Sequence, residues 1–150
     1  MSDPDKRLET CTDCDPRSAS EIKVEAKSEN PLDASTFEPP LAPRYPVVTI
    51  EYCDRCRWLH RATWIATELS VTFPPPQIQT ISLVAAAAPL PAGRFRMWLA
   101  EAPNGAQSDP IMTLIWDRKV EDGFPDLKVV KQRIRDKVAP NMSLGHSDRK

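Results

Sequence analysis

Between Cys53 and Cys56 the spacing of the apolar residues changes from that of a strand to that of a helix. Residues 45–52 (YPVVTIEY), just before this change, are rich in β-branched side chains, as is typical of a buried strand. From Cys56 onward, apolar residues recur at the spacing of one helix face: Trp58, Ala62, Ile65 and Leu69. The prolines of residues 73–76 (FPPP) cannot continue a helix. The sequence therefore predicts a strand joined to a helix through the two cysteines.

The rest of the chain predicts three more strands and one more helix. Residues 78–84 alternate apolar and hydrogen-bonding side chains, and residues 95–101 and 111–116 read as two strands of an antiparallel hairpin. Residues 127–138 have helical spacing, with Asp126 near the start. The order is βαβ followed by ββα. Because a right-handed crossover makes the first two strands parallel, we expect an α/β fold with a four-stranded mixed sheet and two helices.

The N-terminal part of the chain differs in composition from the rest. Residues 1–46 hold seven of the sixteen prolines and none of the four glycines, and residues 1–44 carry six basic and ten acidic side chains. Large apolar residues are too sparse there to offset the entropy cost of ordering the segment. We therefore expect a disordered, acidic, proline-containing tail, residues 1–44, and one folded domain, residues 45–150.

Charge and hydropathy exclude several classes of function. A formal net charge of −1 gives no strong attraction to nucleic acid or anionic lipid. No apolar run approaches the roughly 20 residues of a membrane span, and the N-terminus resembles neither a signal peptide nor a transit peptide. We therefore expect a cytoplasmic protein without nucleic-acid or membrane partners. Thiols are kept reduced there, so the four cysteines indicate catalysis or metal binding rather than a disulfide framework.

Cys53 and Cys56 lie where the first strand meets the first helix, and reactive groups of open α/β sheets gather at the carboxyl ends of strands. Residues three apart on a helical turn have Cβ atoms roughly 5 to 6 Å apart, so their disulfide would be somewhat strained and readily reduced. Arg55 and Arg57 flank Cys56, opposed only by Asp54, and the helix N-terminus adds positive charge. The pair is therefore predicted to ionise readily.

A second CxxC pair, Cys11 and Cys14, has the same spacing in different surroundings. Three carboxylates in that segment oppose thiolate formation, and no predicted helix offsets them. The two pairs together could supply four thiolates to a zinc ion, although the 38 residues between them exceed the roughly 15 to 20 of zinc ribbons. Zinc binding, and a Cys53–Cys56 pair of inert buried thiols, are the alternatives to redox chemistry.

These motifs resemble the selenoprotein W-related, or Rdx, family of thioredoxin-like proteins. The resemblance covers roughly residues 46–148 and is carried by IEYCDRCRWLHRATWIATEL, AGRFRMWL, LIWDRKVEDGFPDLKVVKQRIRDKV and LGHSD. A lone CxxC is a weak signal, because metal sites share it. The succession of a strand, CxxC, a Trp-rich helix and a terminal helix after the WDRK and GFP motifs is far more specific.

The resemblance implies a thioredoxin-like fold without an extra helix between the second and third strands. It also implies redox activity, with glutathione or protein disulfides as substrates, and a 14-3-3-type protein as a candidate partner. The second motif position is often selenocysteine in the family, and Cys56 in its place implies slower exchange. The cis-proline that faces the thioredoxin site has two candidate counterparts here, Pro89 and Pro91.

Other residues near the motif are assigned structural roles. His60 lies four residues after Cys56 and could act as a base, but a solvent-facing position on the helix is favoured. His146, in a polar terminal segment, is a weaker candidate. Trp58 and Trp64 are predicted to pack in the core.

Two groups of charged residues are singled out. Asp117, Arg118 and Lys119 follow the fourth strand, where we expect a solvated cap, with partner docking as the alternative. A basic edge near the thiols is predicted to hold the carboxylates of glutathione: Arg55, Arg57 and Arg61.

The sequence thus predicts a thiol–disulfide redox protein that needs no cofactor and whose catalytic residues are Cys53 and Cys56, and the family resemblance implies a glutathione-linked oxidoreductase. One thiolate attacks a disulfide, sulfenic acid or glutathione adduct, and the other resolves the mixed disulfide. The order of attack stays open, because Cys56 occupies the selenocysteine position whereas thioredoxins use the first cysteine, usually the more exposed one. The alternatives are a redox-regulated binding module without turnover and a zinc-binding domain.

Overall fold

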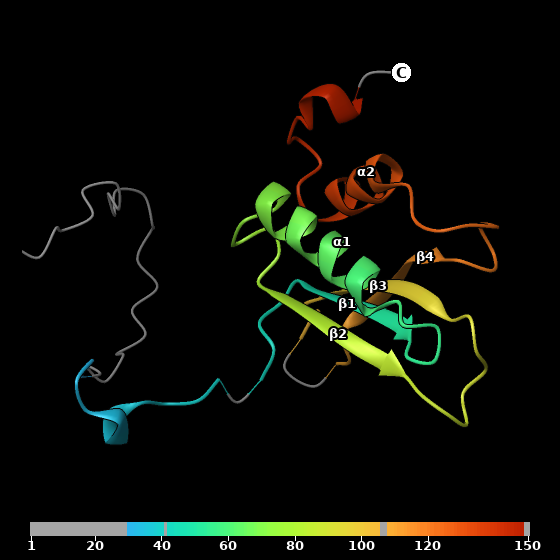
Figure 1. Ribbon diagram of the computed structural model, residues 1–150. Helices are drawn as coiled ribbons and strands as arrows, with labels where there is room; N and C mark the ends of the chain where they lie inside the picture. The colour runs from blue at the N-terminus through green and yellow to red at the C-terminus, as the bar shows by residue number, and fades with distance from the viewer. Residues whose placement is uncertain (1–29, 41, 106–107, 149–150) are drawn as a thin grey trace, which may run out of the picture. The chain divides into compact units, whose positions relative to one another are not determined.

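The computed structural model describes residues 30–40, 42–105 and 108–148. The predicted thioredoxin-like α/β fold, βαβ followed by ββα, is confirmed (Figure 1). Its elements are β1 (Val47–Cys53), α1 (Leu59–Thr72), β2 (Thr80–Ala86), β3 (Phe95–Glu101), β4 (Ile111–Asp117) and α2 (Leu127–Val138). Two short 3-10 helices are also described: η1 (Ala34–Thr36) and η2 (Gly145–Asp148).

The contacts divide the chain into two units, Met1–Pro39 and Pro40–Lys150. In the described part of the first unit, the carboxylate of Asp33 caps η1 by accepting a hydrogen bond from the amide of Ser35 at 3.0 Å. No residue of η1 is buried. The predicted disordered tail falls mostly outside the described residues, so it stays a prediction.

The sheet of the second unit has the strand order β2-β1-β3-β4. β1 pairs parallel to β2, with Cys53 opposite Ala86, and antiparallel to β3, while β3 pairs antiparallel to β4. α1 is the crossover between the parallel strands β1 and β2. This topology makes β1 an interior strand and brings the carboxyl ends of β1, β2 and β4 to the same edge of the sheet as the amino end of β3.

The first helix begins later than its apolar spacing predicts. Cys56 was expected in the first helical turn, but α1 starts at Leu59 and residues 54–58 form turns. Arg57 has a φ of 55°, a left-handed conformation that a right-handed helix cannot contain. α1 ends at Thr72, directly before the proline-rich segment, as predicted.

The second strand is also displaced from its predicted range, 78–84. Ile78 is buried in the core, but pairing with β1 starts only at Thr80. The amide of Gln79 donates to the carbonyl oxygen of Pro46 at 2.9 Å, which holds this segment beside the start of β1. The apolar pattern thus identified a buried segment, but it did not show that Ile78 lies in the loop before the strand.

The second helix and the strands of the hairpin agree with prediction. α2 spans the predicted residues 127–138, and the carboxylate of Asp126 caps it by accepting a hydrogen bond from the amide of Lys128 at 2.8 Å. β3 matches residues 95–101, and β4 extends one residue beyond the predicted 111–116. These elements place Asp117 at the end of β4, in register with Arg96 of β3.

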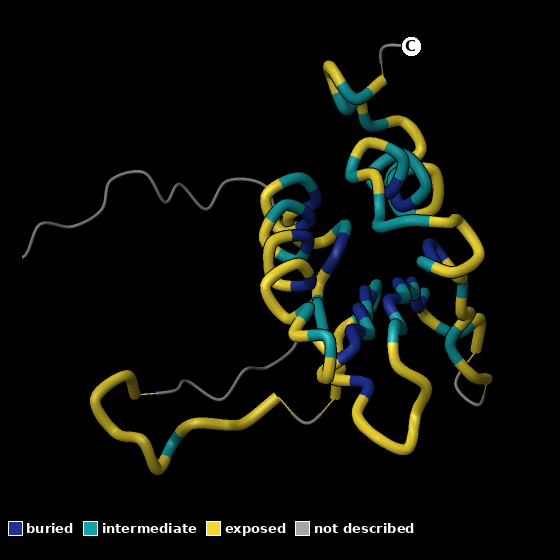
Figure 2. The backbone as a smooth tube through the Cα atoms, turned by 45° about the vertical axis from the view of Figure 1, so that its right-hand side comes forward, coloured by how far each residue is buried: buried dark blue, intermediate teal, exposed yellow. Residues whose placement is uncertain are grey.

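Both α-helices lie on one face of the sheet, and the buried positions lie between the two layers (Figures 1 and 2). The core is built from β1, β3, β4, α1 and α2, and Ile81 of β2 packs against it; its least exposed side chains include Val48, Ile50, Leu69, Phe73, Phe95, Met97, Leu99, Val130 and Ile134. The ammonium of Lys131 on α2 lies 3.0 Å from the carboxylate of Glu68 on α1, which ties the helices together.

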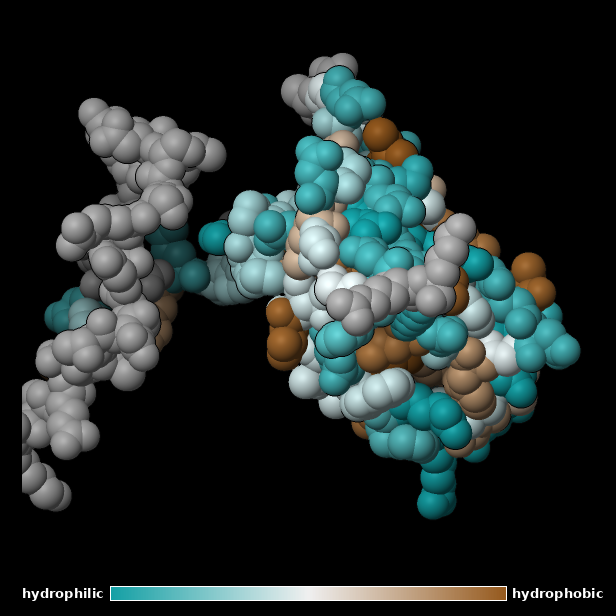
Figure 3. Space-filling model, turned by 90° about the horizontal axis from the view of Figure 1, so that it is seen from above, coloured by the Kyte–Doolittle hydropathy of each residue, from teal (hydrophilic) through white to brown (hydrophobic). Residues whose placement is uncertain are grey.

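Seen from above, the helix side is mainly hydrophilic, with hydrophobic residues scattered across it (Figure 3). Among the described residues, no helix has both the length and the apolar character needed to span a bilayer.

Candidate active site

The cysteine pair lies at the carboxyl end of the interior strand. Cys53 is the last residue of β1, and Cys56 lies in the turn that leads to α1. The turn is closed by the amide of Arg57, which donates to the carbonyl oxygen of Asp54 at 2.8 Å. Both cysteines are free thiols. The sequence-based placement at the strand–helix junction therefore holds, although no helical turn contains the pair.

The two thiols differ in exposure. Cys53 is fully buried, with 0% of its surface accessible, whereas Cys56 is partly exposed. The thioredoxin pattern, in which the first cysteine is usually the more exposed, is therefore wrong for this chain. Cys53 closes an interior strand and is covered by neighbouring strands and loops, whereas Cys56 lies beyond the sheet edge.

The two thiols also differ in acidity, because they share a hydrogen bond. The thiol of Cys56 donates to the sulfur of Cys53, and this bond is the largest cause that lowers the pKa of Cys53 to about 7. The amide of Gly93 and the charge of Arg55 act in the same direction, against the effect of burial. The same hydrogen bond raises the pKa of Cys56, as does its burial. The pair therefore holds one proton firmly, on Cys56, and releases the other near neutral pH.

Gly93 supplies a backbone amide to both sulfurs from the loop between β2 and β3. Its φ of 82° is left-handed, a conformation that glycine adopts without strain. A Cβ at this position would lie 3.8 Å from Cε of Lys119 and 3.9 Å from a guanidinium nitrogen of Arg118, which is ordinary contact. Glycine is thus required by backbone conformation rather than by space. Sequence reasoning missed this residue; the PAG triplet marked only a connection.

The same loop is joined to the cysteine turn by Arg55. Its guanidinium donates to the carbonyl oxygen of Leu90 at 2.7 Å. Because a carbonyl is neutral, Arg55 keeps its full charge and lowers the pKa of both Cys53 and Cys56. In this loop the Ala88–Pro89 peptide bond is cis, so Pro89 is the one of the two candidate prolines with that geometry.

The predicted basic edge is divided among different contacts. Besides Arg55, which bonds to the loop, Arg61 stacks over the ring of Phe124 at 4.1 Å from the centroid, and Arg57 is exposed in the turn. The shared role of these three arginines in holding glutathione stays a prediction.

The aromatic residues of α1 are only partly as expected. Trp58 packs edge-to-face on Phe124 and Phe95, with centroid distances of 4.8 Å and 6.4 Å, so its core role is confirmed. Trp64 is 54% exposed, so its predicted core role is wrong. Helical spacing explains the difference, since the buried face of α1 carries Ala62, Ile65 and Leu69.

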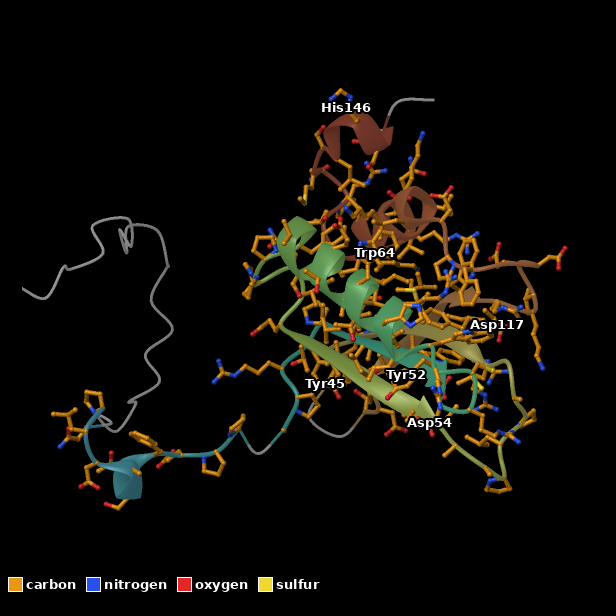
Figure 4. All side chains as sticks on the ribbon, in the orientation of Figure 1. Tyr45, Tyr52, Asp54, Trp64, Asp117 and His146 are labelled. Atoms are coloured by element: carbon orange, nitrogen blue, oxygen red, sulfur yellow. The ribbon has the colours of Figure 1, made fainter. Side chains whose placement is uncertain are left out.

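The two histidines do not join the cysteine pair. His60 is exposed, and its Nδ1 lies 3.0 Å from the carbonyl oxygen of Arg57, in agreement with the favoured surface role. His146 lies on η2, on the far side of the helix layer from Asp54 of the cysteine turn (Figure 4).

The charged residues after β4 are not a solvated cap. Asp117 is only 7% exposed and forms an ion pair with Arg96 at 2.5 Å. Its other carboxylate oxygen accepts hydrogen bonds from the amides of Lys119 and Val120. Burial would raise the pKa of Asp117, but the guanidinium of Arg96 and these two amides together hold the pKa below its usual value. Of the three residues predicted to form the cap, Asp117, Arg118 and Lys119, only Lys119 is exposed.

Arg118 also has a structural contact. Its guanidinium stacks over Trp58 at 4.9 Å and over Phe124 at 5.2 Å. These neutral rings leave the charge of Arg118 uncompensated beside the cysteine turn.

The second cysteine pair, Cys11 and Cys14, lies outside the described residues. Within the described part of the chain, no group of three or more His, Cys, Asp or Glu side chains is placed to hold a metal ion. The two-pair zinc site therefore stays an untested alternative.

Comparison with known proteins gives one family match. The model of the Rdx family matches residues 47–136. A solved structure of a Bordetella parapertussis protein is 41% identical, covers 61% of this chain and 95% of its own, and has a TM-score of 0.46. A selenoprotein W-related protein from Vibrio cholerae is 36% identical with the same coverage, 61% and 95%, and a TM-score of 0.48. No curated protein matches the chain.

Proposed function

The chain belongs to the Rdx, or selenoprotein W-related, family, and we propose that its Cys53–Cys56 pair carries out thiol–disulfide exchange. The family is generally redox-linked. The observation that supports the proposal is the hydrogen bond between two free thiols, which lowers the pKa of Cys53 to about 7. At that pKa about half of the thiol is ionised at neutral pH, compared with about 3% at an ordinary pKa of roughly 8.5.

The exchange balances as a two-electron transfer. The Cys56 thiolate attacks one sulfur of a substrate disulfide, forms a mixed disulfide and releases the first substrate thiolate. The Cys53 thiolate then attacks the sulfur of Cys56, forms the Cys53–Cys56 disulfide and releases the second substrate thiolate. One leaving thiolate takes up the proton that passes from Cys56 to Cys53, and the other takes up a proton from the solvent. The substrate is reduced and the protein pair is oxidised.

Exposure supports Cys56 as the attacking residue. A substrate disulfide must approach the attacking sulfur directly, and Cys56 is partly exposed while Cys53 has no accessible surface. The second attack is intramolecular and needs no exposure, so it suits Cys53. Cys56 becomes nucleophilic when its proton passes to Cys53 along the hydrogen bond that joins them.

Glutathione and protein disulfides are the proposed substrates, in the cytoplasm, where glutathione is abundant and thiols are kept reduced. A 14-3-3-type protein is proposed as a partner on the family resemblance. Neither assignment rests on a contact in the structure.

Trapping of the mixed disulfide tests the proposal. In the full chain with Cys11→Ser and Cys14→Ser, incubation of the Cys53→Ser variant with glutathione disulfide should accumulate a glutathione adduct on Cys56, detected by intact mass. Cys56→Ser should form its adduct far more slowly, because the remaining sulfur is buried. The variant that lacks all four cysteines is the blank.

The outcomes separate the alternatives. Oxidation of the intact pair by glutathione disulfide no faster than that of free cysteine, in the chain with only Cys11→Ser and Cys14→Ser, would refute exchange and favour a redox-regulated binding module. Faster adduct formation on Cys53 would keep exchange as the function and reverse the order of attack.

A further inference from the structure

A cavity of about 60 Å³ lies beside the cysteine loop, lined by Pro91, Arg94, Arg96, Asp117 and Lys119. We propose that it binds a carboxylate of the disulfide substrate, so that the protein exchanges preferentially with anionic disulfides. The inference rests on the proposed exchange function and names the substrate class for that site. The volume of the cavity exceeds the roughly 10 to 15 Å³ that one water molecule needs by the same measure, so a carboxylate group fits.

The walls of the cavity have an excess of positive charge. Three of the five lining residues are basic and one is acidic. The acidic residue, Asp117, is held by Arg96 and by two backbone amides, so its oxygens already have donors. Arg94 is 3.5 Å from the carboxylate of Glu51, a long and weak ion pair. Within the described residues, Lys119 has no carboxylate partner, and its ammonium is free to meet an incoming anion.

Further cations near the cavity are bound only to neutral groups. Arg55 donates to the carbonyl oxygen of Leu90, and Arg118 stacks on aromatic rings. These contacts fix the side chains without neutralising them. The edge of the sheet at the cysteines therefore carries positive charge that the net charge of the whole chain, −1, conceals.

The cavity is adjacent to the reacting sulfurs. Arg94 follows Gly93 directly, and consecutive Cα atoms are about 3.8 Å apart. The amide of Gly93 bonds to both sulfurs, and the Lys119 side chain passes 3.8 Å from where a Gly93 Cβ would be. A carboxylate in the cavity thus lies beside the loop whose Gly93 amide bonds to Cys53 and Cys56. Asp54 and Asp117 mark this common end of the sheet (Figure 4).

Three small disulfides of similar length and different charge test the inference: dithiodipropionate, an anion; bis(hydroxyethyl) disulfide, which is neutral; and cystamine, a cation. Each is mixed with the reduced full chain carrying Cys11→Ser and Cys14→Ser, and the rate of oxidation of the cysteine pair is measured at neutral pH. We expect the anion to react about two- to five-fold faster than the neutral disulfide, once each rate is divided by that of free cysteine. About 1 M salt, where the Debye length is roughly 3 Å, should remove most of this preference.

Two variants locate the preference. Lys119→Gln should lower the ratio of anion to neutral rates toward one, and Lys119→Glu should shift the preference toward cystamine. Lys137→Gln on α2 is the matched control, since Lys137 is exposed, has no carboxylate partner among the described residues and does not line the cavity. It should leave every rate unchanged.

The results distinguish this inference from the function on which it rests. Equal normalised rates for the three disulfides, or an anion preference that Lys119→Gln and Lys119→Glu leave intact, would overturn the anion site while exchange itself stands. If none of the disulfides oxidises the pair faster than free cysteine, the proposed function fails, and the anion site fails with it.

Discussion

Removal of the Cys56 thiol should raise the pKa of Cys53. The hydrogen bond from Cys56 is the largest cause of the lowered pKa, ahead of the Gly93 amide, while burial of Cys53 opposes both. In Cys56→Ala the largest favourable contact is lost and the opposing burial persists. The pKa of Cys53 should therefore rise toward that of an ordinary thiol.

The size of the change follows from the ionised fraction. At a pKa of about 7, half of Cys53 is thiolate at neutral pH. At an ordinary pKa of roughly 8.5 the fraction is about 3%, so complete loss of the effect would be a decrease of roughly 15-fold. Because the Gly93 amide and Arg55 remain, we expect a decrease of about three- to ten-fold.

Ultraviolet absorbance of the thiolate, followed against pH, measures this change without requiring access to the buried sulfur. The chain carries Cys11→Ser and Cys14→Ser, so that only the pair contributes. Cys56→Ser is the matched control, since a hydroxyl still donates a hydrogen bond and should leave the midpoint between those of the wild type and Cys56→Ala. A midpoint in Cys56→Ala equal to that of the wild type would show that the thiol–thiol bond does not set the acidity of Cys53.

Four other predictions concern the fold and the site. Asp117→Asn should destabilise the protein by about 1–3 kcal/mol in urea unfolding, because Arg96 loses its charged partner. The wild-type advantage is present above the unfolded pKa of roughly 3.9 and should be lost as pH falls through the lowered folded value. Ile134→Ala should lower the free energy of unfolding by about 2–5 kcal/mol, because Ile134 is buried in the core. Val120→Ala, at an exposed position, should leave the free energy of unfolding almost unchanged in the same measurement. Gly93→Ala should strain the loop, move its amide away from the sulfurs and raise the midpoint of the thiolate absorbance. Elemental analysis of the purified full chain should find substoichiometric zinc; one equivalent, released by thiol oxidation, would support the zinc alternative.

The fold could be predicted because its signals are local. Among the described residues, β-branched enrichment and alternating or helical spacing located the four strands and the two α-helices, and α2 and β3 have the predicted bounds. The start of α1 was wrong because the left-handed conformation of Arg57 leaves no mark in the spacing of apolar residues. The burial of Asp117 was missed because its partner, Arg96, lies on another strand and is brought opposite only by the register of β3 and β4.

The chemistry of the site was less predictable than its position. The CxxC spacing located two sulfurs, but their acidity depends on Gly93, 37 residues after Cys56, in a loop that the sequence marked only as a connection. The exposure of the pair was reversed because it depends on β1 being an interior strand, and strand order is a property of the whole sheet. The acidity of the two CxxC sulfurs is thus set by the β2–β3 loop, which lies far from the motif in the sequence.

One sulfur of the pair is ionised and the other is accessible, and the surrounding hydrogen-bond donors stabilise negative charge on either sulfur. Cys53 carries the negative charge at neutral pH but is buried, whereas Cys56 is accessible but holds the proton. The Gly93 amide and Arg55 lower the pKa of both thiols, so negative charge is stabilised on either sulfur. Transfer of the shared proton from Cys56 to Cys53 therefore moves the charge to the accessible atom without leaving these donors. In the second step of the proposed exchange the charge returns to Cys53, which the same Gly93 amide stabilises.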